Sequence, residues 1–368
     1  MRVLFTASGL KVGGATMAML HLLLGLPSQG VKPILLSTKP LPRFRFIYER
    51  LREKGVEIIF FGDPIGGVWF WLKLFLESIR VIKEKNVGLV HCHGTKEALV
   101  VGLAAKLLGR KMVYTVEGDP LLEMRYSGGY GLLSRLALTF AWFAGLRLAD
   151  VVVGCSRWMA RHLERYGVEA QEASNPIDIE RFSSAHGEGL GGLRVVSVAR
   201  FAEVKGLETL LHAAKEVVSR IPDVKFLLVG GGPLEDKLKD LAKRLSIQKN
   251  IEFMGFRSDT EKIVAGSDIL ILPSLYEPFG MAAAEALAAG KPVIVARTGG
   301  LQEIVRDGVD GFLFTPGNYR ELAEKLLRVL RDEGLRRRMG EEARRGASRF
   351  APEIVAKTYV RIYREVLS

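Results

Sequence analysis

Short, nearly continuous apolar segments alternate with longer helical patterns along the whole chain. Apolar runs without polar alternation are typical of parallel strands whose sheet is covered by helices on both faces. We predict six such strands in each half of the chain: Arg2–Ser8, Pro33–Ser37, Val56–Phe61, Val87–His93, Lys111–Val116 and Val151–Cys155, then Arg194–Ala199, Lys225–Val229, Ile251–Phe253, Ile269–Pro273, Val293–Ala296 and Phe312–Phe314. The pattern predicts an α/β protein with two facing Rossmann-like domains, parallel sheets and an interdomain cleft.

The domain boundary is predicted from a glycine-rich stretch in the middle of the chain. Residues 183–192 read Ser-Ser-Ala-His-Gly-Glu-Gly-Leu-Gly-Gly, a composition typical of a linker. We predict an N-terminal domain over residues 1–185 and a C-terminal domain over 186–350, with a final helix at 351–368 that packs back onto the first domain. A length of 368 residues suits two domains, because single cores stop growing beyond about 250–300 residues.

The charge balance limits the kinds of partner. The chain has 53 Lys and Arg against 41 Asp and Glu, a net charge of +12, and residues 1–185 account for +8 of it (24 basic minus 16 acidic). A basic excess suits nucleic acid, anionic lipid or a phosphate-rich substrate. The sequence has no recognised nucleic-acid-binding motif, so nucleic acid is the least favoured of the three.

Other compositional features bear on compartment and source. Cys92 and Cys155 lie inside apolar runs, which predicts buried thiols in a reducing, cytoplasmic compartment. The start of the chain reads as a strand rather than a secretory signal. The longest apolar run, 136–146, has eleven residues and is too short to span a bilayer, so any membrane attachment would be peripheral, at the inner face. The scarcity of Asn and Gln favours a thermophilic source.

Glycine-rich turns follow several predicted strands and indicate phosphate binding by backbone N–H groups. Residues 9–16 nearly fit a P-loop, but Ala15 stands where the P-loop lysine belongs, which argues against a P-loop NTPase. The turn at 230–232 lacks the third glycine of the dinucleotide fingerprint, which argues against a dehydrogenase. Gly13, Gly14 and Gly231 remain candidate phosphate-binding residues.

Two cations follow the first predicted strand of the C-terminal half. Arg200 stands at the carboxyl end of that strand, and Lys205 comes five residues later, directly before Gly206 and a predicted helix. Because strand ends face the ligand in open α/β sheets, these cations are candidates to neutralise a diphosphate leaving group. The alternative is that both are ordinary surface cations in a loop.

The segment Glu277-Pro-Phe-Gly-Met-Ala-Ala-Ala-Glu285 carries the strongest local signal. It follows a predicted strand and opens a helix, so the free N–H groups near Gly280 favour an anion. Glu285, two turns after Glu277, is able to face the same side and accept hydrogen bonds from hydroxyls, as a sugar-rich ligand requires. The alternative is that Glu277 serves the helix start while Glu285 forms a surface pair.

These motifs together resemble those of the retaining GT-B enzymes of glycosyltransferase family 4, over essentially the whole chain. The resemblance rests on these elements: Arg200 with Lys205-Gly206, the Glu277-x7-Glu285 segment, Gly299-Gly300-Leu-Gln-Glu303, Val12-Gly13-Gly14-Ala15 and Asn175-Pro-Ile-Asp178. It implies a glycosyltransferase (a hexosyltransferase) that needs no cofactor or metal and takes a UDP-, GDP- or ADP-sugar as donor. The acceptor is not identified, with lipid-linked and glycan acceptors as candidates.

The resemblance also implies roles for individual residues. Arg200 and Lys205 would hold the donor diphosphate, and Glu277 would bind the hydroxyls of the transferred sugar. The remaining contacts to the donor would come from the N–H groups of Phe279, Gly280 and Met281, from Glu285 at the ribose, and from Gly14 of the first domain at the phosphate. Two alternatives remain open: a GT-B nucleotide-sugar epimerase, and a nucleotide-sugar-binding module without catalysis.

One departure from the family pattern lies in the first domain. After the predicted strand 111–116 the family commonly has a His near the donor sugar, whereas this chain has Glu117. Glu117 is therefore a candidate catalytic residue, with a loop carboxylate of no catalytic role as the alternative. His93 lies near the end of a predicted strand and is a second candidate, while His91 is predicted to be structural. The two histidines lack a third ligand at metal-site spacing, which disfavours a metal site.

Aromatic and basic residues gather in the first domain. They occur at 42–52 and 68–76, and at 126–131 before the apolar run 136–146. These segments are candidates for contact with an anionic membrane surface that presents the acceptor. The alternative is ordinary helices packed on the sheet.

Overall fold

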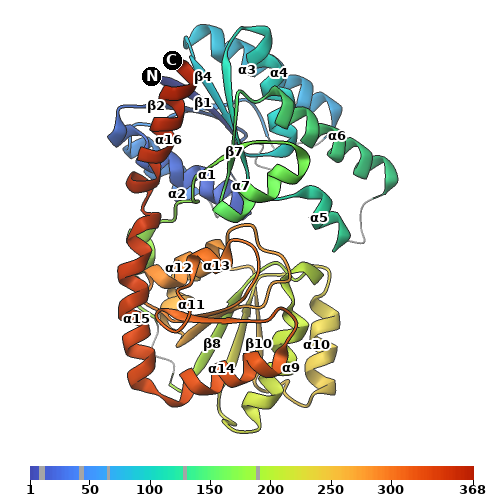
Figure 1. Ribbon diagram of the computed structural model, residues 1–368, viewed down its shortest axis with the longest axis vertical. Coiled ribbons are helices and arrows are strands. Elements are labelled where there is room, and N and C mark those ends of the chain that lie inside the picture. Colours follow the sequence, from blue (N-terminus) through green and yellow to red (C-terminus); the bar gives the residue numbers. More distant parts are fainter. Residues whose placement is uncertain (8–12, 41–44, 64–66, 127–130, 188–190) are drawn as a thin grey trace. The chain divides into compact units, whose positions relative to one another are not determined.

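The computed structural model describes residues 1–7, 13–40, 45–63, 67–126, 131–187 and 191–368 (Figure 1). The chain forms two compact units: the first comprises Met1–Met124, Gly128–Ile177 and Phe350–Ser368, and the second Arg125–Ser127 and Asp178–Arg349. The chain passes from one unit to the other at Ile177/Asp178, whereas the predicted boundary at 185/186 falls after helix α8 (Ile179–Ser183). Part of the predicted linker, 188–190, lies outside the described residues.

The first unit contains a parallel seven-stranded sheet in the order β3-β2-β1-β4-β5-β6-β7. Its strands are β1 (Arg2–Ala7), β2 (Lys32–Ser37), β3 (Glu57–Phe60), β4 (Leu89–Cys92), β5 (Lys111–Val116), β6 (Val151–Gly154) and β7 (Ala170–Glu172). Six correspond to predicted strands, but β7 was missed. This edge strand is a short Ala-Gln-Glu segment that pairs only with β6, so it has no apolar run to reveal it.

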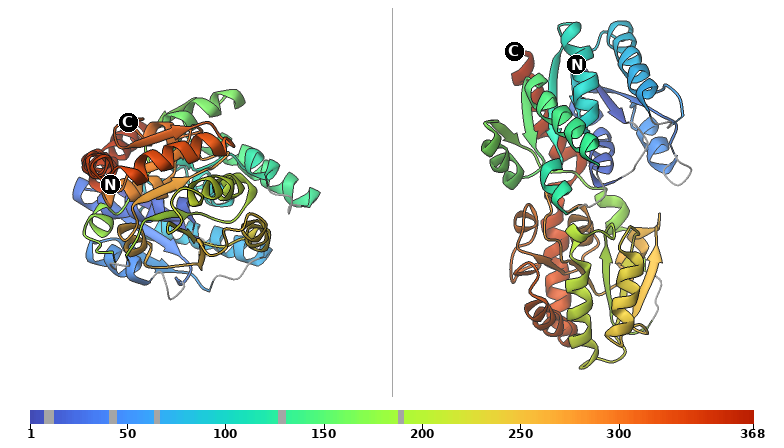
Figure 2. Two further views of the ribbon diagram at one scale, coloured as in Figure 1. Left: turned by 90° about the horizontal axis from the view of Figure 1, so that it is seen from below. Right: turned by 90° about the vertical axis from the view of Figure 1, so that its right-hand side faces the viewer.

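Helices cover both faces of this sheet (Figure 2). They are α1 (Gly14–Gly25), α2 (Arg45–Glu53), α3 (Val68–Glu84), α4 (Thr95–Leu107), α5 (Pro120–Arg125), α6 (Leu132–Leu148), α7 (Arg157–Leu163) and α16 (Pro352–Leu367), with short 3-10 turns η1 (Pro27–Gln29) and η3 (Glu164–Tyr166). The last helix, α16, packs on α1 and buries Tyr359 and Tyr363 in the core of the first unit. Gly25 permits this approach, because a Cβ there would lie 2.2 Å from the carbonyl oxygen of Pro352.

The helices α3, α4 and α6 form a layer on the opposite face. Alternate residues of β5 show the two sides, since Val113 belongs to the core beneath α1 and α16. Its neighbour Met112 faces α4 instead, where a Cβ on Gly102 would lie 2.6 Å from the Met112 sulfur. Helix α4 lies between α3 and α6 and contacts both.

The second unit contains a parallel six-stranded sheet in the order β10-β9-β8-β11-β12-β13. Its strands, all predicted, are β8 (Arg194–Val198), β9 (Lys225–Val229), β10 (Ile251–Gly255), β11 (Ile269–Leu272), β12 (Val293–Ala296) and β13 (Gly311–Phe314). Its helices are α8, α9 (Leu207–Val218), α10 (Glu235–Arg244), α11 (Thr260–Ala265), α12 (Met281–Ala288), α13 (Leu301–Ile304), α14 (Tyr319–Arg331) and α15 (Glu333–Ala347), with 3-10 turns η4 (Glu203–Lys205) and η5 (Ser348–Phe350).

The prediction of two Rossmann-like domains with parallel sheets is confirmed. Because all strands of a sheet run the same way, their carboxyl ends meet at one edge, where ligands of this fold class bind. Among the described residues, no helix combines the length and the apolar character needed to cross a bilayer.

Candidate active site

In the second unit, Lys205 is placed by a tight turn at the end of β8. Gly206, with φ +61°, lies between η4 and α9 and packs on the end of β11, where a Cβ would lie only 2.1 Å from the carbonyl oxygen of Pro273. The backbone N–H of Leu275 donates to the carbonyl of Val204 at 2.8 Å, which ties the two loops together. Lys205 therefore lies beside the loop that carries Glu277.

Glu277 accepts two hydrogen bonds on the same carboxylate oxygen. Lys205 Nζ donates to Oε2 at 2.7 Å, and the hydroxyl of Ser274 donates to it at 3.2 Å. Both charged side chains are largely buried, with 22% of Lys205 and 13% of Glu277 exposed. Among the described residues the other oxygen, Oε1, has no hydrogen-bond partner, so this carboxylate still offers an acceptor to a ligand.

The backbone around Glu277 is held by two glycines from the loop after β12. The N–H of Gly300 donates to the Glu277 carbonyl at 3.0 Å, and a Cβ on Gly299 would lie 1.9 Å from that same oxygen. Any side chain at Gly299 would therefore push the two loops apart. The glycine pair noted in the sequence thus has a packing role that positions the carboxylate.

Helix α12 begins directly after Gly280, which adopts φ +112°. A Cβ at Gly280 would lie 2.4 Å from a methyl carbon of Leu301, so both conformation and space require glycine there. Phe279 is buried and Met281 is partly exposed. The first N–H groups of a helix have no carbonyl partner within it, so the start of α12 offers donors to an anion.

Glu285 lies one turn before the end of α12, near α8 and α11. The residue is partly exposed, and desolvation by the protein packed around its carboxyl group raises its pKa to about 7. Arg181 opposes the increase, whereas the charges of Asp178 and Glu261 add to it. Arg181 is itself engaged with Glu261 at 2.6 Å, so it compensates Glu285 only in part.

The remaining predicted residues of the second unit lie in two loops. Arg200 is exposed, and its side chain makes no hydrogen bond or ion pair with the described residues. Gly231 lies in the turn after β9, where its carbonyl accepts from the N–H of Phe201 at 2.9 Å. A Cβ on Gly231 would lie 2.9 Å from the ring of Phe256, so this ring leaves no room for a side chain at position 231.

In the first unit, Glu117 links two other polar side chains. Its Oε1 lies 2.9 Å from His93 Nδ1, and its Oε2 accepts from Asn175 Nδ2 at 2.6 Å. His93 and Glu117 come from the ends of β4 and β5, which are neighbours in the sheet, and Asn175 follows β7. All three residues are largely buried. His93 and Glu117 were predicted separately, and the structure brings them together.

His93 and Asn175, the two residues that hydrogen-bond to Glu117, each have a second polar atom that is buried. His93 Nε2 and Asn175 Oδ1 have no hydrogen-bond partner among the described residues. When Nδ1 of a neutral imidazole donates to a carboxylate, Nε2 carries the lone pair and accepts. This cluster therefore presents acceptors suited to a hydroxyl donor, with Glu117 orienting them rather than meeting the ligand itself.

The other predictions for the first unit concern Gly13, Gly14 and His91. Gly13 precedes α1 and Gly14 begins it, both exposed, and a Cβ on Gly13 would meet nothing within 4 Å. Residues 9–12 of the same loop lie outside the described residues.

His91 is structural in character. Its ring nitrogens lie 2.7 Å from the Tyr363 hydroxyl and 2.8 Å from that of Thr115, and burial lowers its pKa well below the usual value.

Sequence reasoning did not single out Asn175 as a partner of Glu117. Asn175 was noted only as part of the Asn-Pro-Ile-Asp motif, and a polar residue directly before a proline in a loop was the available signal. The pairing itself depends on β7, the strand that was missed, because β7 leads the chain back to the end of β5 and β6.

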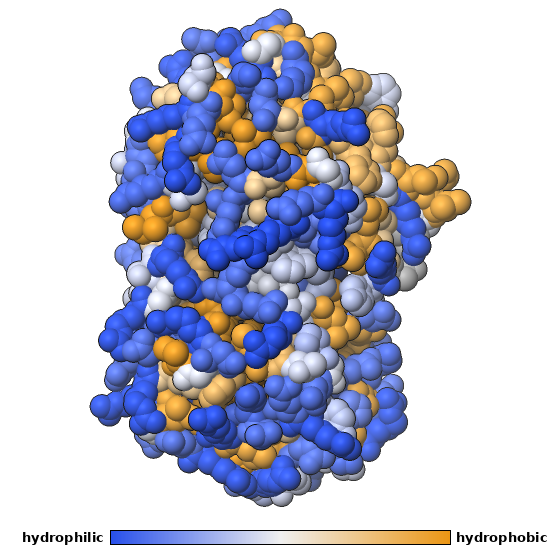
Figure 3. Space-filling model, in the orientation of Figure 1, coloured by the Kyte–Doolittle hydropathy of each residue, from blue (hydrophilic) through white to orange (hydrophobic). Residues whose placement is uncertain are grey.

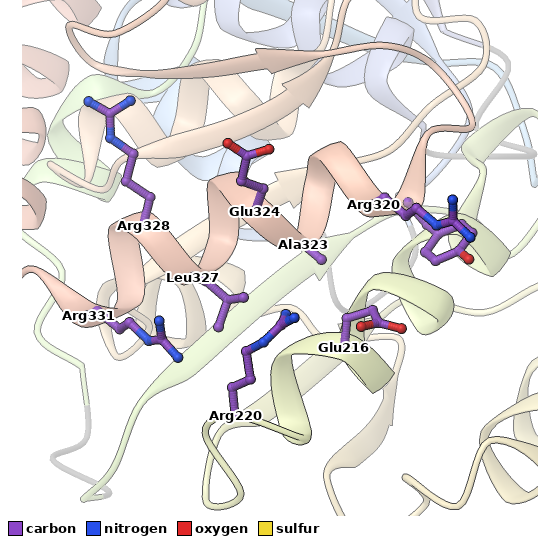
Figure 4. A pocket seen from close by; sticks show the side chains of 9 residues that line it. Glu216, Arg220, Arg320, Ala323, Glu324, Leu327, Arg328 and Arg331 are labelled. Carbon is purple, nitrogen blue, oxygen red and sulfur yellow. The ribbon is translucent and has the colours of Figure 1, made fainter.

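A groove of about 600 Å³ lies elsewhere in the second unit, between α9 and α14 (Figure 4). Its lining includes Glu216 of α9, Arg220 just after α9, and Glu324, Arg328 and Arg331 of α14. It contains none of the predicted site residues, since it is formed by the outer faces of helices rather than by loops at strand ends.

Two family models match consecutive parts of the chain. Residues 12–181 match "Glycosyltransferase Family 4", and residues 178–346 match "Glycosyl transferases group 1". Together they extend over nearly all of both units.

Individual proteins show the same similarity. The chain is 28% identical over 311 residues to the N-acetyl-alpha-D-glucosaminyl L-malate synthase of Bacillus anthracis, covering 80% of this chain and 79% of that protein. It is 27% identical to the Escherichia coli UDP-Gal:alpha-D-GlcNAc-diphosphoundecaprenol alpha-1,3-galactosyltransferase, covering 72% of each. The crystal structure of Anabaena Alr3699/HepE in complex with UDP-glucose superposes with a TM-score of 0.80 at 21% identity, covering 99% of this chain and 100% of the other. The chain therefore belongs to glycosyltransferase family 4 and has a GT-B fold.

Proposed function

We propose that this glycosyltransferase transfers a hexose from a nucleoside-diphosphate sugar with retention of the anomeric configuration. The observation that carries the proposal is the group formed by Lys205, Glu277 and Ser274 beside the start of α12. It combines a cation, an open carboxylate oxygen and free helix N–H groups, the features that a sugar diphosphate requires. The relatives from E. coli and Anabaena, whose names mention UDP-Gal and UDP-glucose, support a nucleotide-sugar donor.

In the proposed complex, Lys205 and Arg200 neutralise the diphosphate. Arg200 is exposed and makes no side-chain pair with the described residues, so it is able to turn toward a phosphate without breaking an existing interaction. Lys205 stays hydrogen-bonded to Glu277, and its ammonium group interacts with the carboxylate and the phosphate at the same time. A fixed cation near the leaving group stabilises the charge that develops as the glycosidic bond breaks.

The sugar and nucleoside take the remaining contacts. We propose that Glu277 Oε1 accepts a hydroxyl of the transferred sugar, and that Glu285 accepts the ribose hydroxyls. The backbone N–H groups of Phe279, Gly280 and Met281 contact the donor, and glycines from two loops allow the backbone to approach it closely: Gly13 and Gly14 before α1, and Gly231 after β9. In the first unit, Glu117 orients His93 and Asn175, which accept hydrogen bonds from hydroxyls of the bound ligand.

The proposed step is a substitution on one face of the sugar. The acceptor oxygen bonds to the anomeric carbon as the bond from that carbon to the phosphate oxygen breaks, and the departing phosphate takes the acceptor's proton. Charge is stabilised by fixed cations and helix dipoles, so the step needs no protein nucleophile.

For the acceptor we propose a lipid-linked saccharide, with a soluble glycan as the alternative. Exposed apolar side chains on α3 and α6 of the first unit support the lipid-linked class. The name of the E. coli relative contains diphosphoundecaprenol, a lipid diphosphate.

The donor proposal is tested by thermal denaturation with UDP-, GDP- and ADP-sugars. A ligand at about 100 times its Kd stabilises a protein by about 2.7 kcal/mol, a shift of several degrees in Tm. We expect the sugars of one nucleotide class to raise Tm, and to raise it more than the corresponding free nucleoside diphosphate does. The Glu277→Ala variant should lose most of this difference. If no nucleotide sugar raises Tm, the proposal is wrong.

A further inference from the structure

Exposed large apolar side chains are concentrated on one helical layer of the first unit. Of the sixteen among the described residues, eleven belong to α3, α4 and α6. These three helices lie side by side on one face of the sheet, with α4 between the others. Figure 3 shows apolar residues gathered in this part of the molecular surface, including the end of α6 that projects from it. We call this surface the α3–α4–α6 face.

The first half of α6 contributes most to it. Residues 132–140 read Leu-Leu-Ser-Arg-Leu-Ala-Leu-Thr-Phe, and no residue among them is buried. Leu133 is 82% exposed and Phe140 is 68% exposed, whereas Trp142 and Leu146 in the second half are buried. Six of these nine residues are apolar, and Ser134, Arg135 and Thr139 are the polar ones. An apolar helix face of this size normally packs on a core or contacts lipid, and in this structure it is not buried.

Helix α3 adds an exposed apolar stripe. Trp69, Leu72 and Leu76 recur at the spacing of a single helix face, while Phe70 and Leu74 point into the core. The predicted segment 68–76 is thus divided between core and surface. By contrast, the predicted segment 42–52 is not part of the face. Residues 42–44 lie outside the described residues, and the apolar side chains of α2 are buried (Ile47, Tyr48 and Leu51) or partly buried (Phe46) against the core of the first unit. Residues 127–130 also lie outside them.

Helix α4 connects the two apolar regions. Leu103 is 43% exposed and Leu107 is 70% exposed, one turn apart on the outer side of this helix. Lys96 at its start lies over the ring of Trp71 on α3, 5.6 Å from the ring centroid.

Cations outnumber acids on this face. The exposed charged residues of the three helices are Lys73, Arg80, Lys83, Lys96, Lys106, Arg135 and Arg147 against Glu84, while the acids Glu77 and Glu97 are partly exposed. Arg80 pairs with Glu77 and Lys106 with Asp150, each at 2.7 Å, and the balance of the three helices stays positive. The cations therefore occur among the apolar residues rather than on a separate surface. Apolar insertion and attraction to anionic headgroups act together in peripheral membrane proteins, which bind weakly when either is missing.

We propose that the α3–α4–α6 face binds an anionic bilayer surface, with the first half of α6 in the boundary between headgroups and acyl chains. A second copy of this chain fits the face less well. In a two-fold contact the same patch meets itself, so seven cations would face seven cations. An anionic lipid surface matches both the apolar and the basic character of the face.

The test is cosedimentation of the full chain with vesicles, which requires neither donor nor acceptor and so stands or fails independently of the proposed function. We expect binding to vesicles of phosphatidylglycerol and phosphatidylcholine in equal parts at low ionic strength, and little binding to phosphatidylcholine alone. The double variant Leu133→Asp/Phe140→Asp should lower the partition coefficient about ten-fold or more. Both positions are exposed, so circular dichroism and Tm should stay unchanged.

The matched control carries Ile354→Asp and Leu367→Asp, two exposed apolar residues of the same unit that lie on α16. It should bind vesicles as the unchanged protein does. Three results would each overturn the proposal: no sedimentation of the unchanged protein with anionic vesicles, equal binding by the α6 variant, or a dimer in solution that this variant dissociates without any vesicle binding.

Discussion

The two units hold their central glutamates in different ways. Glu277 in the second unit receives both of its hydrogen bonds on Oε2, whereas Glu117 in the first unit uses one oxygen for His93 and the other for Asn175. Among the described residues Glu277 therefore keeps one oxygen for a ligand, while Glu117 has both engaged. The comparison teaches that similar carboxylates suit different proposed roles: Glu277 has an oxygen available for direct contact, whereas the bonds of Glu117 suit it to orient His93 and Asn175.

The largest effect should follow Glu277→Gln. Gln cannot balance the charge of Lys205, and its amide is a weaker acceptor for the sugar hydroxyl. Loss of one transition-state contact of this kind costs about 100- to 1000-fold in kcat. Steady-state assays of nucleotide release would measure it. The matched control is Glu203→Gln, an exposed carboxylate on η4, and similar rates for both variants would contradict direct contact.

Glu285→Gln should change stability with pH. The pKa of Glu285 in the folded protein is about 7, above the usual 4.5, so the folded state binds this proton more tightly than the unfolded state. Ionisation of Glu285 thus lowers stability as pH rises from about 4.5 to 7, by up to about 3 kcal/mol.

The Gln variant should consequently be more stable than the unchanged protein at pH 8 and about equal to it at pH 4.5, as measured by urea denaturation. It should also bind the donor more weakly, because the ribose loses its carboxylate acceptor. A stability difference that does not vary with pH would show that Glu285 keeps an ordinary pKa.

Gly280→Ala should destabilise the second unit and weaken donor binding. The new Cβ would combine a positive φ with a contact of 2.4 Å to Leu301. Gly308 also has a positive φ, but a Cβ there would meet nothing within 4 Å, so Gly308→Ala measures conformational strain alone. We expect Gly280→Ala to lower the free energy of unfolding by about 1–2 kcal/mol more than Gly308→Ala does. Equal losses would mean that the loop adapts freely.

The smallest effect should follow Glu117→Gln, which keeps the shape of the cluster but frees His93 to change tautomer. We expect kcat/KM to fall about ten-fold, as for loss of an orienting partner rather than of a contact. Glu164→Gln, at an exposed carboxylate of the same unit, is the control. Unchanged kcat/KM would remove Glu117 from the site.

A double-mutant cycle with His93→Ala sharpens this point. If Glu117 acts through His93, the loss from Glu117→Gln should largely disappear once His93 is absent, giving a coupling energy of at least about 1 kcal/mol. Additive losses would instead indicate that Glu117 contacts the substrate independently.

The sequence alone was sufficient to predict the alternating α/β pattern and every strand except β7. Lys205, Glu277 and Gly280 belong to short loops directly after apolar strands, so local pattern and parallel topology place them at one edge. The same pattern placed His93 and Glu117 at strand ends, each as a separate residue. These positions follow from the chain near each residue, whereas their roles stay predictions.

Only the tertiary structure determined which of these groups meet and which apolar residues stay exposed. Asn175 reaches Glu117 through β7, a polar edge strand whose formation depends on pairing with β6 rather than on its own residues. In the apolar run 136–146 none of the residues 136–140 is buried, whereas Ala141, Trp142, Gly145 and Leu146 are, although the composition hardly changes along the run. Such outcomes depend on which neighbours a segment finds in space, and packing between distant segments is not encoded in any local periodicity.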